Sequence, residues 1–185
     1  MNIRSFSIVI IALLAAACGN EEGHEVQGSI STDNVGFLLT ASELEEHGRD
    51  GLNIQANVSG LMNRAREAGL PIEDIEDWVA IDYAESVDGA RLNFALLDLI
   101  DAPSAHARFD DLVSEFVLVE SDQGIGERFA GLAPITGGVH TVVMFLVGDK
   151  VTVMTTTTSL TDMEPLMTSE QLVEIARLVA PRIIP

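Results

Sequence analysis

The chain has 185 residues and a formal charge of −19 at neutral pH, from 29 acidic and 10 basic side chains. This length is sufficient for one domain with a hydrophobic core. An acidic surface of this size repels nucleic acid and anionic lipid headgroups, which argues against a nucleic-acid-binding protein. Cys18 is the single cysteine, so an intrachain disulfide is excluded.

Residues 1–17 have the pattern of a signal peptide. Arg4 forms a short positive segment, and an apolar segment from Phe6 to Leu14 is followed by three alanines. The apolar run from Ile8 to Ala17 is ten residues long, whereas a membrane-spanning helix needs about 20. A cleaved signal peptide is therefore favoured over a permanent anchor.

The segment Leu14–Cys18, LAAAC, resembles the lipobox of bacterial lipoproteins, although Ala15 stands where leucine is usual. The resemblance implies that Cys18 is lipidated, with palmitate among its acyl chains, and anchors the chain to a membrane of the bacterial cell envelope. Gly19 in place of Asp gives no sign of inner-membrane retention, so the outer membrane is expected in a Gram-negative cell. A second interpretation is an ordinary secreted protein, because Ala15 and Ala17 also fit the usual cleavage rule.

Residues 19–34 are polar and rich in Gly, Glu, Ser and Asn, with no apolar period. Such a composition is typical of a flexible tether. We therefore expect a lipidated tether over 18–34 and a single α+β domain over 35–185.

Two short helices are predicted at the start of this domain. Ser42 and Glu45 fit a capping box for a helix that ends near Gly48. A second helix is predicted from Val58 to Ala68, because apolar residues recur at helical spacing and glycine and proline follow.

The next segment predicts a hairpin. The acidic run from Ile72 to Asp77 is expected to be loop, and strands are expected over Trp78–Ala84 and Ala90–Leu99 around a turn at 86–89. The apolar side chains that share one face of this hairpin are Val79, Ile81, Tyr83, Leu92, Phe94 and Leu96.

A third helix is predicted from Pro103 to Phe116, followed by a short strand over Val117–Glu120. The apolar stripe of this helix consists of Ala105, Phe109, Leu112, Val113 and Phe116. The segment from Gly124 to Gly138 holds five glycines and one proline and is predicted to be loop.

The residues from Val139 to Thr158 give the clearest hairpin pattern, around a tight turn at Gly148 and Asp149. The first run is apolar on both faces, as in a strand inside a sheet. The second run ends in four threonines, as an edge or near-edge strand would. The hairpin as a whole is expected at the centre of the sheet, with the rest of the chain as its cover.

The final helix is predicted from Met167 to Ile183, with Thr168 or Ser169 as its cap and Pro181 in or just past its last turn. Its inward residues are expected to be Leu172, Ile175, Ala176, Val179 and Ile183. The order of elements predicts an α+β fold, with an antiparallel sheet built from two hairpins and helices packed mainly on one face.

The segment over 35–184 resembles the small α+β domains of uncharacterised bacterial lipoproteins, loosely PsbP-like. The resemblance rests on LLTASELEEHG, SAHARFDDLVS, GIGERFAG and VVMFLVGDKVTVMTT. It implies an envelope-anchored binding or accessory module, often of no known activity, and it carries over no functional residue.

No catalytic, cofactor-binding or metal-binding residues are predicted. No two histidines have the i, i+4 spacing of a helical metal site, and the sequence contains neither HExxH nor G-x-S-x-G. The four histidines are His24, His47, His106 and His140. The GIGERFAG segment is expected to be an inter-strand loop, because the pattern is not a dinucleotide fingerprint. Met167, close to Asp162 and Glu164, is interpreted either as groove lining or as core filling.

The acidic residues cluster at Glu43–Glu46, Glu73–Asp77 and Asp110–Asp111. The second run lacks the order of oxygen donors in a calcium loop, so a solvated acidic loop is predicted. The overall acidity fits either solubility and a saline habitat or a site for a cation or a basic partner.

The leading functional hypothesis is a non-enzymatic lipoprotein that binds a protein partner or a small ligand at the envelope. The alternative is a carrier of a lipid or another hydrophobic ligand, because the aliphatic content is high. A carrier requires an apolar cavity of at least several hundred cubic ångströms.

Overall fold

The computed structural model describes residues 36–47, 55–84, 90–131, 141–157 and 167–183. The predicted signal peptide, Cys18 and the tether lie outside these residues, as do the turn at 86–89 and the segment 158–166. Among the helices it does describe, none is long and apolar enough to cross a membrane.

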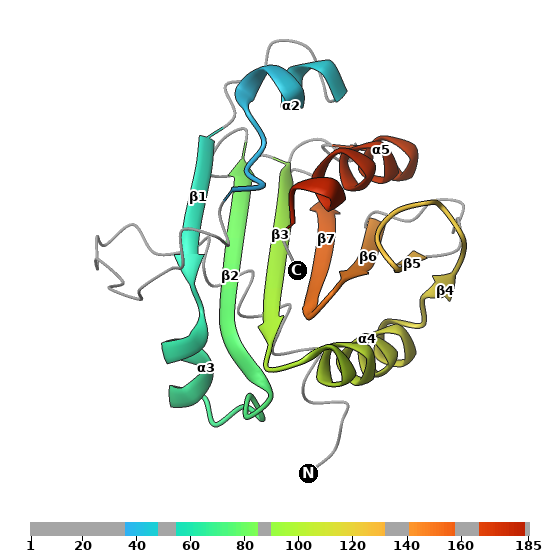
Figure 1. Cartoon of the computed structure of the whole chain (residues 1–185). Helices are drawn as coiled ribbons and strands as arrows, with labels where there is room; N and C mark the ends of the chain where they lie inside the picture. The colour runs from blue at the N-terminus through green and yellow to red at the C-terminus, as the bar shows by residue number, and fades with distance from the viewer. Residues whose placement is uncertain (1–35, 48–54, 85–89, 132–140, 158–166, 184–185) are drawn as a thin grey trace.

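The described strands form one antiparallel sheet in the order β1-β2-β3-β7-β6-β5-β4 (Figure 1). The strands are β1 (Gln55–Gly60), β2 (Ile75–Ala84), β3 (Arg91–Leu99), β4 (Val119–Glu120), β5 (Arg128–Gly131), β6 (Thr141–Val147) and β7 (Lys150–Thr157). Both predicted hairpins are confirmed, as β2–β3 and β6–β7. They meet where β3 pairs with β7, so that Phe94 lies beside Met154.

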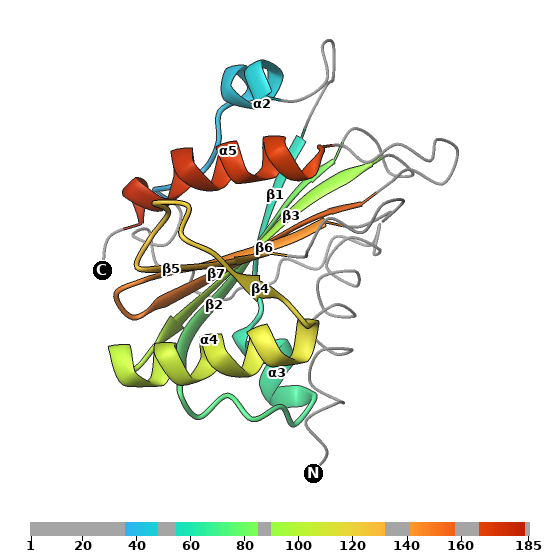
Figure 2. The same ribbon diagram turned by 90° about the vertical axis from the view of Figure 1, so that its right-hand side faces the viewer.

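Helices cover both faces of the sheet (Figures 1 and 2). On one face lie α2 (Ala41–His47), α5 (Ser169–Val179) and the 3₁₀ turn η2 (Ala180–Arg182); on the other lie α3 (Met62–Glu67) and α4 (Ala102–Phe116). The α+β class is confirmed, but the expectation that helices pack mainly on one face is wrong. The central strands are apolar on both sides, and each apolar face must be covered.

The α5-side core contains the residue expected to anchor the second hairpin. Phe145 of β6 is fully buried in a cluster with Leu172, Ile175 and Val179 of α5. These are the helix residues expected to face inward. The cap of α5 is Thr168, whose hydroxyl accepts a hydrogen bond from the Gln171 amide at 3.3 Å. The prediction of the closing helix and of its cap is therefore confirmed.

The α4-side core is built on the other face of the same strands. Met144 and Leu146 of β6 pack in one cluster with Trp78 of β2 and with Phe109 and Leu112 of α4. β6 thus contributes alternate residues to two cores, as its pattern predicted.

The hairpin β6–β7, expected at the centre of the sheet, does lie there, but its second strand, expected at or near the edge, is the middle strand, between β3 and β6. The run of threonines indicates an exposed edge strand, but Thr152 and Thr156 are buried under α5. The Thr156 hydroxyl accepts a hydrogen bond from the Met167 amide at 3.2 Å, which explains how this polar group is accommodated in the core. Met167 is itself buried there, so it fills the core.

Three segments take a different secondary structure from the one predicted. The first three residues of the predicted helix Val58–Ala68 belong to β1, because Val58 pairs with Ile81 of β2, and α3 forms the helical part. The acidic segment expected to be loop supplies the first residues of β2, with a register shift between Ile75 and Asp77. β5 falls inside the glycine-rich segment expected to be loop, where β6 provides its partner.

The capping box of α2 lies two residues earlier than predicted. The Thr40 amide donates to Glu43 Oε2 at 2.8 Å, and the Glu43 amide donates to the Thr40 hydroxyl at 3.3 Å. This register places Leu39 just before the cap and Leu44 at the fourth helical position, and both are buried. A box on Ser42 and Glu45 would lose this hydrophobic staple.

Candidate functional site

The predicted titratable residues are dispersed over the fold. His47 ends α2, and His106 lies on α4 with 45% of its side chain exposed and its Nε2 3.9 Å from Glu127 Oε2. His24 and His140 lie outside the described residues. Within the described ranges, no group of three His, Cys, Asp or Glu side chains could hold a metal ion.

Each of the three acidic runs supplies a carboxylate to an arginine. Glu43 pairs with Arg182 of η2, Asp74 of the second run pairs with Arg108 of α4 at 2.5 Å, and Asp110 pairs with Arg128. These carboxylates therefore tie elements of the fold together.

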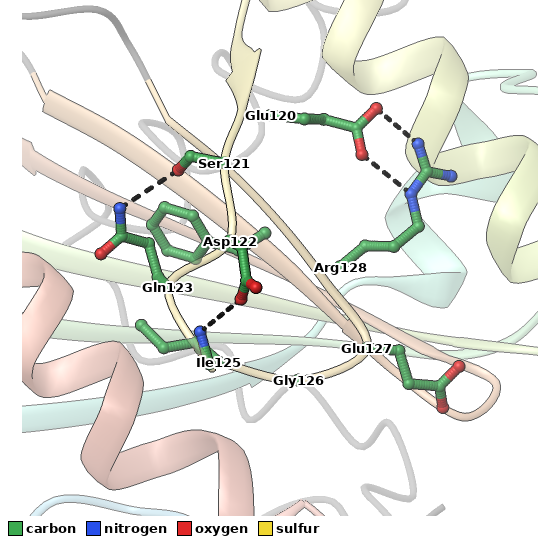
Figure 3. Close-up of a pocket in the computed structure, with 10 residues that line it drawn as sticks. Glu120, Ser121, Asp122, Gln123, Ile125, Gly126, Glu127 and Arg128 are labelled. Carbon is green, nitrogen blue, oxygen red and sulfur yellow. Dashed lines mark hydrogen bonds and ion pairs between the residues drawn. The ribbon is translucent and has the colours of Figure 1, made fainter.

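The segment that carries GIGERFAG lines a hollow on the surface of the described domain. Residues 120–129, which comprise the connection between β4 and β5 and the adjoining strand ends, surround a hollow of about 340 Å³ that opens to solvent (Figure 3). Ile125 and Phe129 line it but belong to the α5-side core, whereas Ser121, Asp122 and Gln123 are exposed. The expectation of an inter-strand loop is confirmed for its first half only, since Arg128 begins β5.

The loop is fixed to the end of β6 and to the β6–β7 turn by close backbone contacts. At Gly126, with φ +61°, an added Cβ would lie 2.3 Å from the Leu146 carbonyl oxygen, so only glycine fits there. The neighbouring Glu127 amide donates to the same carbonyl at 2.8 Å, and Glu127 Oε1 accepts from the Gly148 amide at 2.8 Å. The hollow is therefore built on a positioned backbone.

Arg128 fixes the other side of the loop to α4. Its guanidinium lies 4.4 Å above the ring of Phe109 and contacts both Glu120 and Asp110 at 2.7 Å. Figure 3 shows the paired Glu120 and Arg128 side chains facing each other across the two strands. The hydrogen bond to Glu120 raises the pKa of Arg128, so this cation is permanent.

Hydrogen bonding is the chemistry that this arrangement offers. The three carboxylates that line the hollow already accept hydrogen bonds from Arg128, Gly124 and Gly148, but each keeps solvent access. The lining carries more negative than positive charge, so it favours partners that present hydrogen-bond donors or cationic groups.

A second polar group, on β2 and β3, was missed from the sequence. Asp82 and Asn93 pair across the hairpin and are only 7% and 8% exposed, and Arg91 donates to Asp82 Oδ2 at 2.6 Å. Asp82 Oδ1 accepts no hydrogen bond in the part of the chain described here. The sequence does carry a sign of this pair. Each of the two predicted strands contains a polar residue flanked by hydrophobic ones, Asp82 in the first and Asn93 in the second.

A scan of protein-family models gives no match to this chain, and neither does a search of curated proteins. Among solved structures, the chain is similar to the extracellular domain of PknH from Mycobacterium tuberculosis. The sequence identity is 13%, the match covers 80% of this chain and 92% of that one, and the TM-score is 0.49. No functional residue carries over from this likeness, and the PsbP-like resemblance stays a prediction.

Proposed function

We propose that this chain is a lipoprotein of the bacterial cell envelope, anchored through lipid on Cys18, whose α+β domain is a non-enzymatic binding or accessory module. One observation carries the anchoring: the lone cysteine directly follows three alanines at the end of an apolar run too short to span a bilayer. A thioether-linked diacylglycerol supplies two acyl chains, which hold a protein on a membrane where one chain is marginal.

The charge of the molecule supports a tethered arrangement. A formal charge of −19 repels anionic headgroups. The polar segment 19–34 gives the domain the reach to stand away from the bilayer while it stays attached.

The binding role is supported by the positioned loop between β4 and β5. Its polar groups are held by contacts with α4 and with the β6–β7 turn, so a partner meets a surface that is ordered in advance. The apolar residues that line the hollow are committed to the core, which favours a binding module over the alternative, a lipid carrier.

The anchoring is tested by Cys18→Ser in the native host or a related bacterium, with membrane fractionation and radiolabelled palmitate. We expect the wild type to be labelled and to sediment with membranes, and the variant to remain unlabelled. The matched control adds Ser29→Cys to Cys18→Ser; this restores a thiol away from the apolar run and should not restore the label.

Equal behaviour of wild type and Cys18→Ser, with an unmodified cysteine at the mature N-terminus by mass spectrometry, would leave an ordinary secreted protein. The choice between module and carrier is tested by native mass spectrometry of the full chain purified from membranes. A retained acyl ligand that is not covalently attached would favour the carrier.

A further inference from the structure

β4 forms one edge of the sheet, just after α4 (Figure 1). The Ser121 amide donates to the Phe129 carbonyl at 3.1 Å, so these opposed residues form a hydrogen-bonded pair. Pairs alternate along an antiparallel ladder. Glu120, which lies opposite Ala130, therefore directs its N–H and C=O away from β5, towards the side of β4 on which no described strand pairs.

Two apolar side chains stand beside this edge in solvent. Val117 is 78% exposed and Val119 is 57% exposed. Val117 also has φ +54°, in the left-handed region that β-branched residues rarely occupy. A glycine would avoid both the exposed apolar surface and the unfavourable backbone conformation at this helix end. The valine is thus poorly explained by the stability of the domain alone.

The surroundings of the edge are acidic. The exposed fractions of the Asp110 and Glu120 side chains are 64% and 47%, against 22% for Arg128, which pairs with both of them. The edge therefore combines an apolar pair with excess negative charge. A complementary chain would present apolar residues together with lysine or arginine.

We propose that β4 accepts an extended segment of a partner protein as an additional strand of the sheet. The segment places apolar residues on Val117 and Val119, hydrogen-bonds to the backbone of Glu120, and presents basic side chains to the acidic rim. A second copy of this chain is a poor partner, because two acidic edges repel each other. The inference rests on the proposed binding role and names its partner class, but it does not depend on lipid at Cys18.

The test uses the full chain and a synthetic peptide of about six residues, alternating lysine and valine, the usual length of a strand. By NMR, we expect the Glu120 amide to shift on titration and its hydrogen exchange to slow. We also expect the affinity to fall as salt is added, because the complementarity is partly ionic. The same titration with Cys18→Ser should give the same affinity, which separates this inference from the anchoring.

The peptide controls separate strand addition from simple charge attraction. A peptide of the same composition, N-methylated at alternate residues so that it cannot donate to the edge, should lose binding. A peptide with glutamate in place of lysine should not bind.

The protein variants are Val119→Asp and Val117→Gly, with Ile100→Asp as the matched control. Ile100 is 52% exposed and precedes α4, so the length of this helix separates it from β4 by about 22 Å. We expect Val119→Asp to weaken binding about tenfold and Ile100→Asp to leave it unchanged. Val117→Gly should weaken binding without lowering the melting temperature.

Failure of the lysine–valine peptide to bind would overturn the inference. Equal affinity for the N-methylated peptide would also overturn it, since binding would then not use the sheet edge. Equal loss of affinity in Val119→Asp and Ile100→Asp would place the effect elsewhere than β4.

Discussion

Val117 is a β-branched residue in a backbone conformation that usually favours glycine. It ends α4 in the left-handed conformation, and its amide donates to the Val113 carbonyl. This conformation costs an L-residue with a Cβ about 1–2 kcal/mol, whereas glycine adopts it freely but loses more chain entropy on folding.

We expect Val117→Gly to stabilise the protein by about 0.5–1 kcal/mol, because the relief of strain exceeds the entropic cost. Chemical denaturation of the full chain measures the change. Val119→Gly is the comparison, because Val119 is also exposed but lies in a strand, where glycine should destabilise. A stability loss in Val117→Gly would show that the valine side chain makes a stabilising contact.

At the scale of elements, an ion pair links α2 to the 3₁₀ turn η2. Glu43, in the first turn of α2, bonds to Arg182 of η2, and Arg182 also donates to the Leu38 carbonyl at 3.5 Å. The hydrogen bond from Arg182 and the amide of Thr40 lower the pKa of the Glu43 carboxyl from 4.5 to about 2. The pair therefore links two segments that are distant in sequence.

A lowered pKa gives this contact a defined pH dependence. The stabilisation is complete above the unfolded-state pKa near 4.5 and is lost as the pH falls towards about 2. We expect wild type to be more stable than Glu43→Gln at neutral pH, with the difference shrinking across this window. The measurement is the denaturation midpoint at several pH values, and Glu45→Gln serves as the control. A difference that stays constant down to about pH 2 would show that the Glu43 charge is not responsible.

The second hairpin should dominate the energetics of the sheet, because β6 contributes to both cores. We expect Phe145→Ala to destabilise the protein by about 3–5 kcal/mol, since the cavity under α5 cannot fully collapse. Val147→Ala, at the half-buried end of the same strand, should cost about 1 kcal/mol or less. Denaturant melts of both variants measure the difference. A loss below about 1 kcal/mol for Phe145→Ala would mean that β6 is peripheral.

At the scale of the whole molecule, the excess of negative charge governs how stability responds to salt. A formal charge of −19 makes the folded surface repel itself, and added salt screens this repulsion. We expect molar sodium chloride to raise the melting temperature of the full chain, by about 2–4 °C for each kcal/mol gained. Calcium at matched ionic strength is the control. Stabilisation by millimolar calcium alone would contradict this explanation and point to a specific site in Glu73–Asp77.

The sequence by itself determined the elements whose signals are local. The β6–β7 hairpin follows from two β-rich runs around a turn whose Gly148 has φ +61°, and α4 and α5 follow from apolar stripes at helical spacing. The two-sided apolar pattern of β6 also indicated burial on both faces, which the two cores confirm.

The tertiary structure alone decided which elements are neighbours. The threonines of β7 were compatible with an edge, but pairing with both β3 and β6 makes it the centre of the sheet. β1 is largely polar and β5 has only four residues, so neither carries a strong strand pattern of its own, and they form strands because β2 and β6 offer backbone partners. Likewise, Arg128 meets Phe109, Glu120 and Asp110 only after α4 packs on the sheet. Local periodicity reports which side of an element is apolar, whereas long-range pairing determines what covers that side.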